Sequence, residues 1–65
     1  MNDADKIADR AMFALVNLID ERATLEDMQA WMSWLVFRRL QGEDETVLRS
    51  GYNVMNAFQE KLGAA

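Results

Sequence analysis

Carboxylates are the commonest side chains in this sequence that are able to do acid–base chemistry. Asp and Glu number 11, Lys and Arg together number 7, and neither His nor Cys occurs. The sequence therefore offers no imidazole or thiolate to serve as nucleophile, general base or zinc ligand. A catalytic site would have to be assembled from carboxylates, with help from Lys, Tyr or Ser.

The carboxylates cluster at positions where they would begin a helix or solvate a turn. The clusters are Asp3 with Asp5, Asp20 with Glu21, Glu26 with Asp27, and residues 43–45. Acidic side chains at such positions cap free backbone amides and complement the helix dipole. The sequence has no Glu-x-x-His pair for a di-metal bundle, and its 3 glycines stand singly, so it has no phosphate-binding loop. We therefore expect no catalytic residues, no metal and no cofactor.

The net charge of −4 has the wrong sign for a protein held to nucleic acid by phosphate contacts. A DNA-binding interpretation would make the last helix the reading helix of a helix-turn-helix, with Arg49 on its exposed face. The acidic residues 43–45 at the start of that helix would then face the phosphates. We keep a small DNA-binding regulator as an alternative, and nucleic acid as an unfavoured partner.

Helix signals divide the chain into three segments. Helices are expected over about 3–21, from 24 to just before Gly42, and over about 43–62. No segment alternates between apolar and polar residues with the period of a strand. Short connections indicate that neighbouring helices lie antiparallel. The expected fold class is all-α: a three-helix antiparallel bundle, made of a helical hairpin plus a third helix, in one small domain over residues 1–65.

The helix ends have recognisable capping residues. Asn2 or Asp3 is expected to cap the first helix. Thr24 begins the second, and Asp27 three residues later approximates a capping box. Arg38 and Arg39 fall in the last turn of that helix, where positive charge is favourable.

The composition and the length of the apolar runs indicate in which cellular compartment the protein is expected. Apolar residues make up 51% of the chain, too many for a disordered protein. No apolar run approaches the roughly 20 residues of a membrane span. The first five residues include Asp3 and Asp5 and no basic residue, unlike the start of a secretory signal. We expect a cytoplasmic protein that does not contact a membrane.

The third segment has one apolar face and one polar face. The apolar face, at helical spacing, holds Val47, Gly51, Val54, Met55, Phe58 and Leu62. Gly51 in mid-helix costs about 1 kcal/mol relative to Ala. We therefore expect it to mark a close approach between two helices.

The second segment carries more apolar side chains than one buried face needs. One face is expected to form the core or a dimer interface and holds Leu25, Met28, Trp31, Met32, Leu35 and Val36. A second face holds Ala30, Trp34, Phe37 and Leu40. Large apolar side chains left over after core formation are typical of an interaction site. The residues predicted to bind a partner protein are Trp34, Phe37, Leu40, Arg38 at the rim, and Phe13 of the first segment.

The function expected from these patterns is non-catalytic. A small homodimeric protein would regulate another protein by covering it with an apolar, aromatic helix face, as an inhibitor, anti-activator or chaperone. Accessory proteins of phages, plasmids and secretion operons are often of this kind. The acidic excess favours a partner with a basic surface. Besides the DNA-binding regulator, a purely structural assembly subunit remains an alternative.

Overall fold

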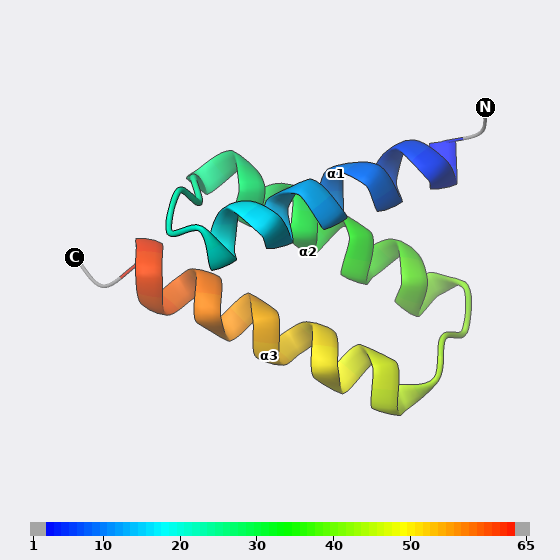
Figure 1. Ribbon diagram of the computed structural model, residues 1–65. Coiled ribbons are helices and arrows are strands. Elements are labelled where there is room, and N and C mark those ends of the chain that lie inside the picture. The colour runs from blue at the N-terminus through cyan, green and yellow to red at the C-terminus, as the bar shows by residue number, and fades with distance from the viewer. Residues whose placement is uncertain (1–2, 64–65) are drawn as a thin grey trace.

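Three α-helices make up the structure, a computed structural model that describes residues 3–63. The helices are α1 (Asp3–Ile19), α2 (Leu25–Leu40) and α3 (Glu45–Leu62), and residues 3–63 form no strand. The expected all-α fold is therefore confirmed. Figure 1 shows α2 running back beside α1 and α3 returning beside α2, with short turns between the helices. Within the described residues, no helix combines the length and the apolar character that a membrane crossing requires.

The start of α2 is a capping box, as the sequence predicts. The Thr24 hydroxyl accepts a hydrogen bond from the Asp27 backbone N–H (3.3 Å), and the Asp27 carboxylate accepts one from the Thr24 N–H (2.9 Å). Two backbone amides that the helix leaves free are satisfied in this way. The same carboxylate oxygen also accepts from the Asn17 side-chain amide of α1 at 3.1 Å. The cap of α2 is thus tied to its neighbouring helix.

Both α1 and α2 end in the same backbone motif. After α1, Glu21 takes a positive φ of 63°, and the Arg22 N–H donates to the Asn17 carbonyl at 2.8 Å. After α2, Gly42 takes a φ of 79°, and the Glu43 N–H donates to the Arg38 carbonyl. These are Schellman turns, in which a left-handed residue lets the chain satisfy carbonyls that the helix leaves free. The first helix was predicted to reach Glu21, but it ends at Ile19 because Glu21 is already left-handed.

The ends of α3 lie where the sequence places them. The Asp44 side chain caps its start by accepting from the Thr46 N–H at 3.1 Å. Gly63 follows its last residue and donates its N–H to the Gln59 carbonyl. Of the two residues predicted to cap α1, Asn2 lies outside the described residues and Asp3 is the first residue of the helix.

The core is small and draws on all three helices. Its buried members are Ala11 and Ala14 of α1, Trp31 and Leu35 of α2, and Met55 and Phe58 of α3. Trp31 is central, since its ring centroid lies 5.0 Å from that of Trp34 and 6.4 Å from that of Phe58. The two alanines leave room for α1 to lie close to α2.

Gly51 marks a close approach between α3 and α2, as predicted. A Cβ atom at this position would lie 2.2 Å from Leu35 Cδ2, closer than real Cβ contacts allow. The Trp31 indole Nε1–H donates to the Gly51 carbonyl at 2.9 Å. The polar atom of the buried tryptophan is therefore paired, and the bond fixes the position of α2 along α3.

Candidate binding surface

The outward side of α2 carries a row of exposed apolar side chains. We call Leu25, Met32, Val36 and Leu40 the α2 outer stripe. At 100° per residue they fall within about 80° of the helix surface. All four are exposed, and Leu40 is 82% exposed. Val36 lies about 180° around α2 from Asp27, which bonds to α1, so the stripe faces away from α1.

The structure divides the face that was predicted to form the core or a dimer interface. Trp31 and Leu35 are buried, and Met28 is half-buried against them. Leu25, Met32 and Val36 lie outside the core on the α2 outer stripe. The division arises because α2 turns the side centred on Trp31 and Leu35 towards Gly51 and Phe58.

The residues predicted to bind a partner protein are also divided. Phe13 is 65% exposed, and Leu40 belongs to the α2 outer stripe. Trp34 and Phe37 are half-buried, and Trp34 packs against the core beside Trp31. Arg38 is half-buried and its guanidinium pairs with the Glu43 carboxylate. These five residues differ in exposure and in the groups they contact, and their role in partner binding stays a prediction.

A second exposed apolar surface lies on α1. We call Asp5, Asp9, Met12, Phe13, Val16 and Ile19 the α1 outer face. All six are exposed, and at 100° per residue they fall within about 120° of the helix surface. Apart from Phe13, the apolar residues of this face were not among those that the sequence singled out. A usable signal was present, because Asp5 and Asp9 lie on the same side of the helix as Met12 and Val16.

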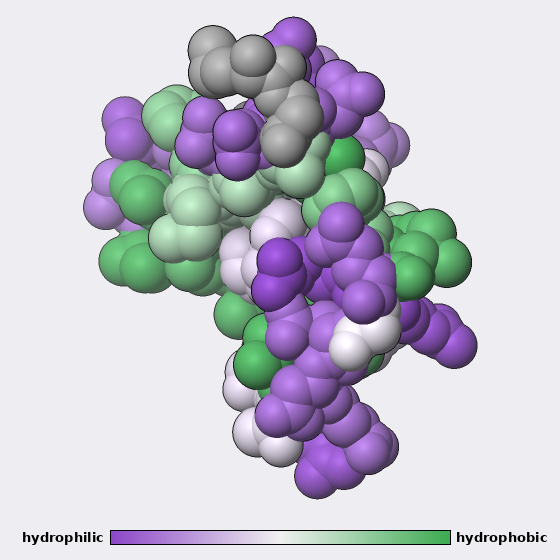
Figure 2. All heavy atoms as spheres, turned by 90° about the vertical axis from the view of Figure 1, so that its right-hand side faces the viewer, coloured by the Kyte–Doolittle hydropathy of each residue, from purple (hydrophilic) through white to green (hydrophobic). Residues whose placement is uncertain are grey.

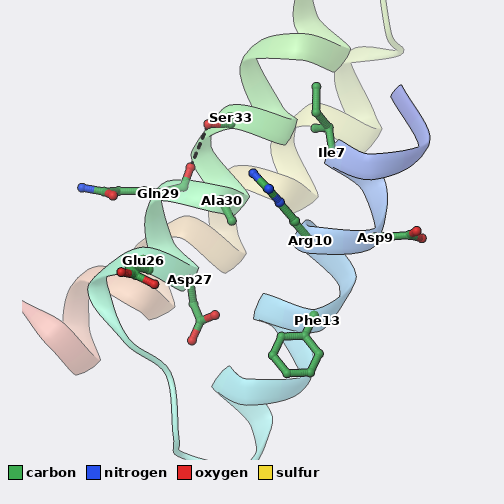
Figure 3. A pocket seen from close by; sticks show the side chains of 9 residues that line it. All are labelled: Ile7, Asp9, Arg10, Phe13, Glu26, Asp27, Gln29, Ala30 and Ser33. Atoms are coloured by element: carbon green, nitrogen blue, oxygen red, sulfur yellow. Dashed lines mark hydrogen bonds between the residues drawn. The ribbon is translucent and has the colours of Figure 1, made fainter. Parts of the chain in front are cut away.

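A groove between α1 and α2 adjoins the α1 outer face. Phe13 and Asp9 line it from α1, and Glu26 and Ala30 line it from α2. In Figure 3, Arg10 extends across the groove towards α2, while Asp9 points away from α2. Ser33, at the upper wall, uses its hydroxyl to bond the Gln29 carbonyl at 3.0 Å. The groove is thus open and partly apolar, with more carboxylates than cations along it.

The apolar surfaces lie on different sides of the molecule. Figure 2 looks at the end where α2 passes into α3, and green apolar surface appears at both edges of the view. Between them, polar surface covers the lower middle, and weakly apolar side chains lie above it. A protein with its apolar surface divided in this way has room for two separate contacts.

The carboxylates of the described residues have structural partners or face water. Asp27 caps α2, Asp44 caps α3, and Glu43 pairs with Arg38. Burial would raise the pKa of Asp27, but hydrogen bonds from the Thr24 N–H, the Asn17 amide and the Thr24 hydroxyl outweigh it, so this pKa is lowered from its ordinary value of 3.8. No group of three or more carboxylates within residues 3–63 is arranged to hold a metal ion.

Two arginines that could contact phosphates in a DNA-binding protein already lie beside carboxylates of this chain. Arg49 lies 3.6 Å from Glu45 on the next turn of α3, and both side chains are exposed. Arg38 pairs with Glu43. Pairing with an adjacent carboxylate weakens the attraction of these guanidinium groups to phosphate.

Comparison with protein-family models finds no match for this chain, and comparisons with curated proteins and with solved structures find none either.

Proposed function

We propose that this protein is a non-catalytic binding module, a homodimer of antiparallel three-helix bundles that attaches to another protein and so inhibits, regulates or escorts it. Each chain forms one small domain, and the protein works in the cytoplasm. The α2 outer stripe joins the two copies, and the α1 outer face receives the partner. Neither contact requires a cofactor or a catalytic residue.

One observation carries this proposal: most of the large apolar side chains that the fold leaves exposed are gathered into two surfaces. Among residues 3–63, ten such side chains are exposed, and eight of them belong to the α2 outer stripe or the α1 outer face. Exposed apolar residues scattered singly would need no explanation, whereas contiguous apolar patches are typical of protein–protein contacts.

The α2 outer stripe suits a second copy of the same chain because its centre carries no charge. Gln29 is the one polar residue of α2 within its arc. A twofold contact places each surface against itself, so a surface without charge pairs with its own copy at no electrostatic cost. Burying a side chain such as Leu40 or Val36 contributes on the order of 2 kcal/mol per residue. Such a pairing also gives so small a core additional stability.

Site-specific photo-crosslinking in the source cell tests partner binding. A photoreactive phenylalanine analogue placed at Phe13 should link the protein to one partner protein. The same analogue at Asn53, an exposed polar position on α3, is the matched control and should link no partner. The linked protein, once identified, should bind the purified module, and Val16→Asp should abolish that binding with the helical circular dichroism unchanged.

Other outcomes would favour the alternatives or reject the proposal. A DNA-binding regulator would be supported if a photoreactive residue on α3 crosslinked to nucleic acid and if Arg49→Ala reduced the affinity of the protein for DNA. Crosslinks only to further copies of the chain, from both Phe13 and Asn53, would support a structural assembly subunit. Equal linking of the same protein from Phe13 and from Asn53 would contradict the proposed surface.

A further inference from the structure

The α1 outer face combines apolar and acidic side chains with no base among them. Met12, Val16 and Ile19 recur at positions i, i+4 and i+7, and Asp5 and Asp9 continue the same row towards the start of the helix. Asp20 follows directly after Ile19 and is also exposed. The row therefore has carboxylates at both of its ends and apolar side chains between them.

The basic residues near this surface lie outside it. Lys6 borders the edge next to Phe13, and Arg10 is turned towards α2 across the groove. Arg22 lies 3.2 Å from Asp20, and both of these side chains are well exposed to water. Asp9 forms no ion pair with any residue in the range 3–63, so no cation of that range neutralises its charge.

This charge pattern argues against a second copy of the chain as the occupant. In a twofold contact the α1 outer face would meet itself, and carboxylates would approach carboxylates. Like charges brought together across an interface repel each other and disfavour the contact. The α2 outer stripe has no such obstacle, so the two surfaces differ in the partner that they suit.

The groove beside Phe13 gives this surface a concave edge. Phe13 and Asp9 belong to both the groove and the α1 outer face, Glu26 adds a further carboxylate from α2, and Arg10 is the one cation among the residues that line the groove. Helices commonly bind such grooves by inserting apolar anchors at i, i+3 or i+4 spacing. A helix that placed Lys or Arg beside its anchors would meet opposite charges at Asp9 and Glu26.

We propose that the occupant of the α1 outer face is a basic amphipathic helix of the partner protein. Its apolar side packs on Met12, Phe13 and Val16, and its Lys and Arg side chains lie opposite Asp9 and Glu26. This inference rests on the proposed function, to which it adds the chemistry of the partner and the place where it binds.

Three designed peptides test the charge requirement. Each is an amphipathic helix of about 18 residues with the same leucine face, and the polar face is all Lys, all Gln or all Glu. Fluorescence anisotropy with the full-length protein should show binding of the Lys peptide, weaker binding of the Gln peptide and none of the Glu peptide. The affinity of the Lys peptide should fall about tenfold as salt is raised from 50 to 500 mM.

Matched charge reversals locate the contact on the protein. Asp9→Lys should weaken binding of the Lys peptide about tenfold. Glu60→Lys changes the net charge equally at an exposed site on α3 and should weaken it less than twofold. Val16→Ser should also weaken binding about tenfold through lost apolar contact. Circular dichroism of each variant checks that the helices are intact.

The inference is overturned if the Gln or Glu peptide binds as tightly as the Lys peptide, if the two charge reversals act equally, or if no peptide binds. Its failure is distinguishable from failure of the proposed function. A partner crosslinked from Phe13 would still establish a protein-binding module, whose partner then lacks a basic helix. If Phe13 links no partner while the Lys peptide binds as expected, the charge preference stands and the cellular role fails.

Discussion

At the scale of single residues, Asp27 does more than begin a helix. Its carboxylate accepts hydrogen bonds from the Thr24 N–H, the Thr24 hydroxyl and the Asn17 amide, so it joins α2 to the preceding turn and to α1. These bonds favour the ionised form and lower its pKa, even though burial acts in the opposite direction. The folded state therefore holds this carboxylate ionised more strongly than the unfolded chain does.

The lowered pKa of Asp27 predicts a pH dependence of stability. Its contribution is fully present above the unfolded value of 3.8 and is lost as the pH falls through the lower pKa of the folded state. We expect Asp27→Asn to be less stable than the wild type at neutral pH, and the difference to shrink below about pH 4. Urea unfolding of both proteins between pH 7 and pH 2 measures this, and a difference that stays constant over that range would contradict the assignment.

At the scale of elements, the packing of α3 on α2 depends on the absence of a side chain at Gly51. Leu35 occupies the space where a Cβ would lie and is itself buried, so it has little room to move. The Trp31 indole bonds the Gly51 carbonyl at the same contact. A close approach and a directional bond together set the relative position of the two helices.

Gly51→Ala should therefore destabilise the protein although Ala is the better helix former. Overpacking costs about 1–3 kcal/mol, and the gain in helix propensity of about 1 kcal/mol offsets part of it. Asn53→Ala, at an exposed position two residues later, is the control and should be neutral or slightly stabilising. Thermal and urea unfolding of both variants test this. A Gly51→Ala protein as stable as the wild type would show that Leu35 is free to move aside.

Local signals in the sequence were sufficient to predict the helices and their ends. Thr24 with Asp27, and glycines at 42 and 63, have capping preferences that act within a few residues. Glu21 was the exception, because a glutamate gives no sign that it will adopt a left-handed conformation. The end of α1 was therefore predicted two residues too late.

The candidate site was harder to predict because it depends on how the helices turn about their axes. Apolar residues surround most of α2, so several orientations would each bury a plausible set. The contact of Leu35 with Gly51 selects one of them, and it leaves Met32 and Val36 outside and Trp34 half-buried. This choice is made by tertiary packing between distant segments, which spacing along one helix does not encode.

At the scale of the whole molecule, the protein has a small core and two apolar surfaces of different charge character. The α2 outer stripe is uncharged at its centre, and the α1 outer face is acidic. We expect the first to hold two copies together and the second to remain free for a partner. This division of roles joins the fold to the proposed function.

Analytical ultracentrifugation of the purified protein tests this division of roles, with no partner needed. The wild type should sediment as a dimer, with twice the 7.5 kDa mass of one chain. Val36→Glu, on the α2 outer stripe, should be a folded monomer, whereas Val16→Glu, on the α1 outer face, should remain a dimer. A wild type that is monomeric at all concentrations, or a dimer lost with Val16→Glu and kept with Val36→Glu, would contradict the account.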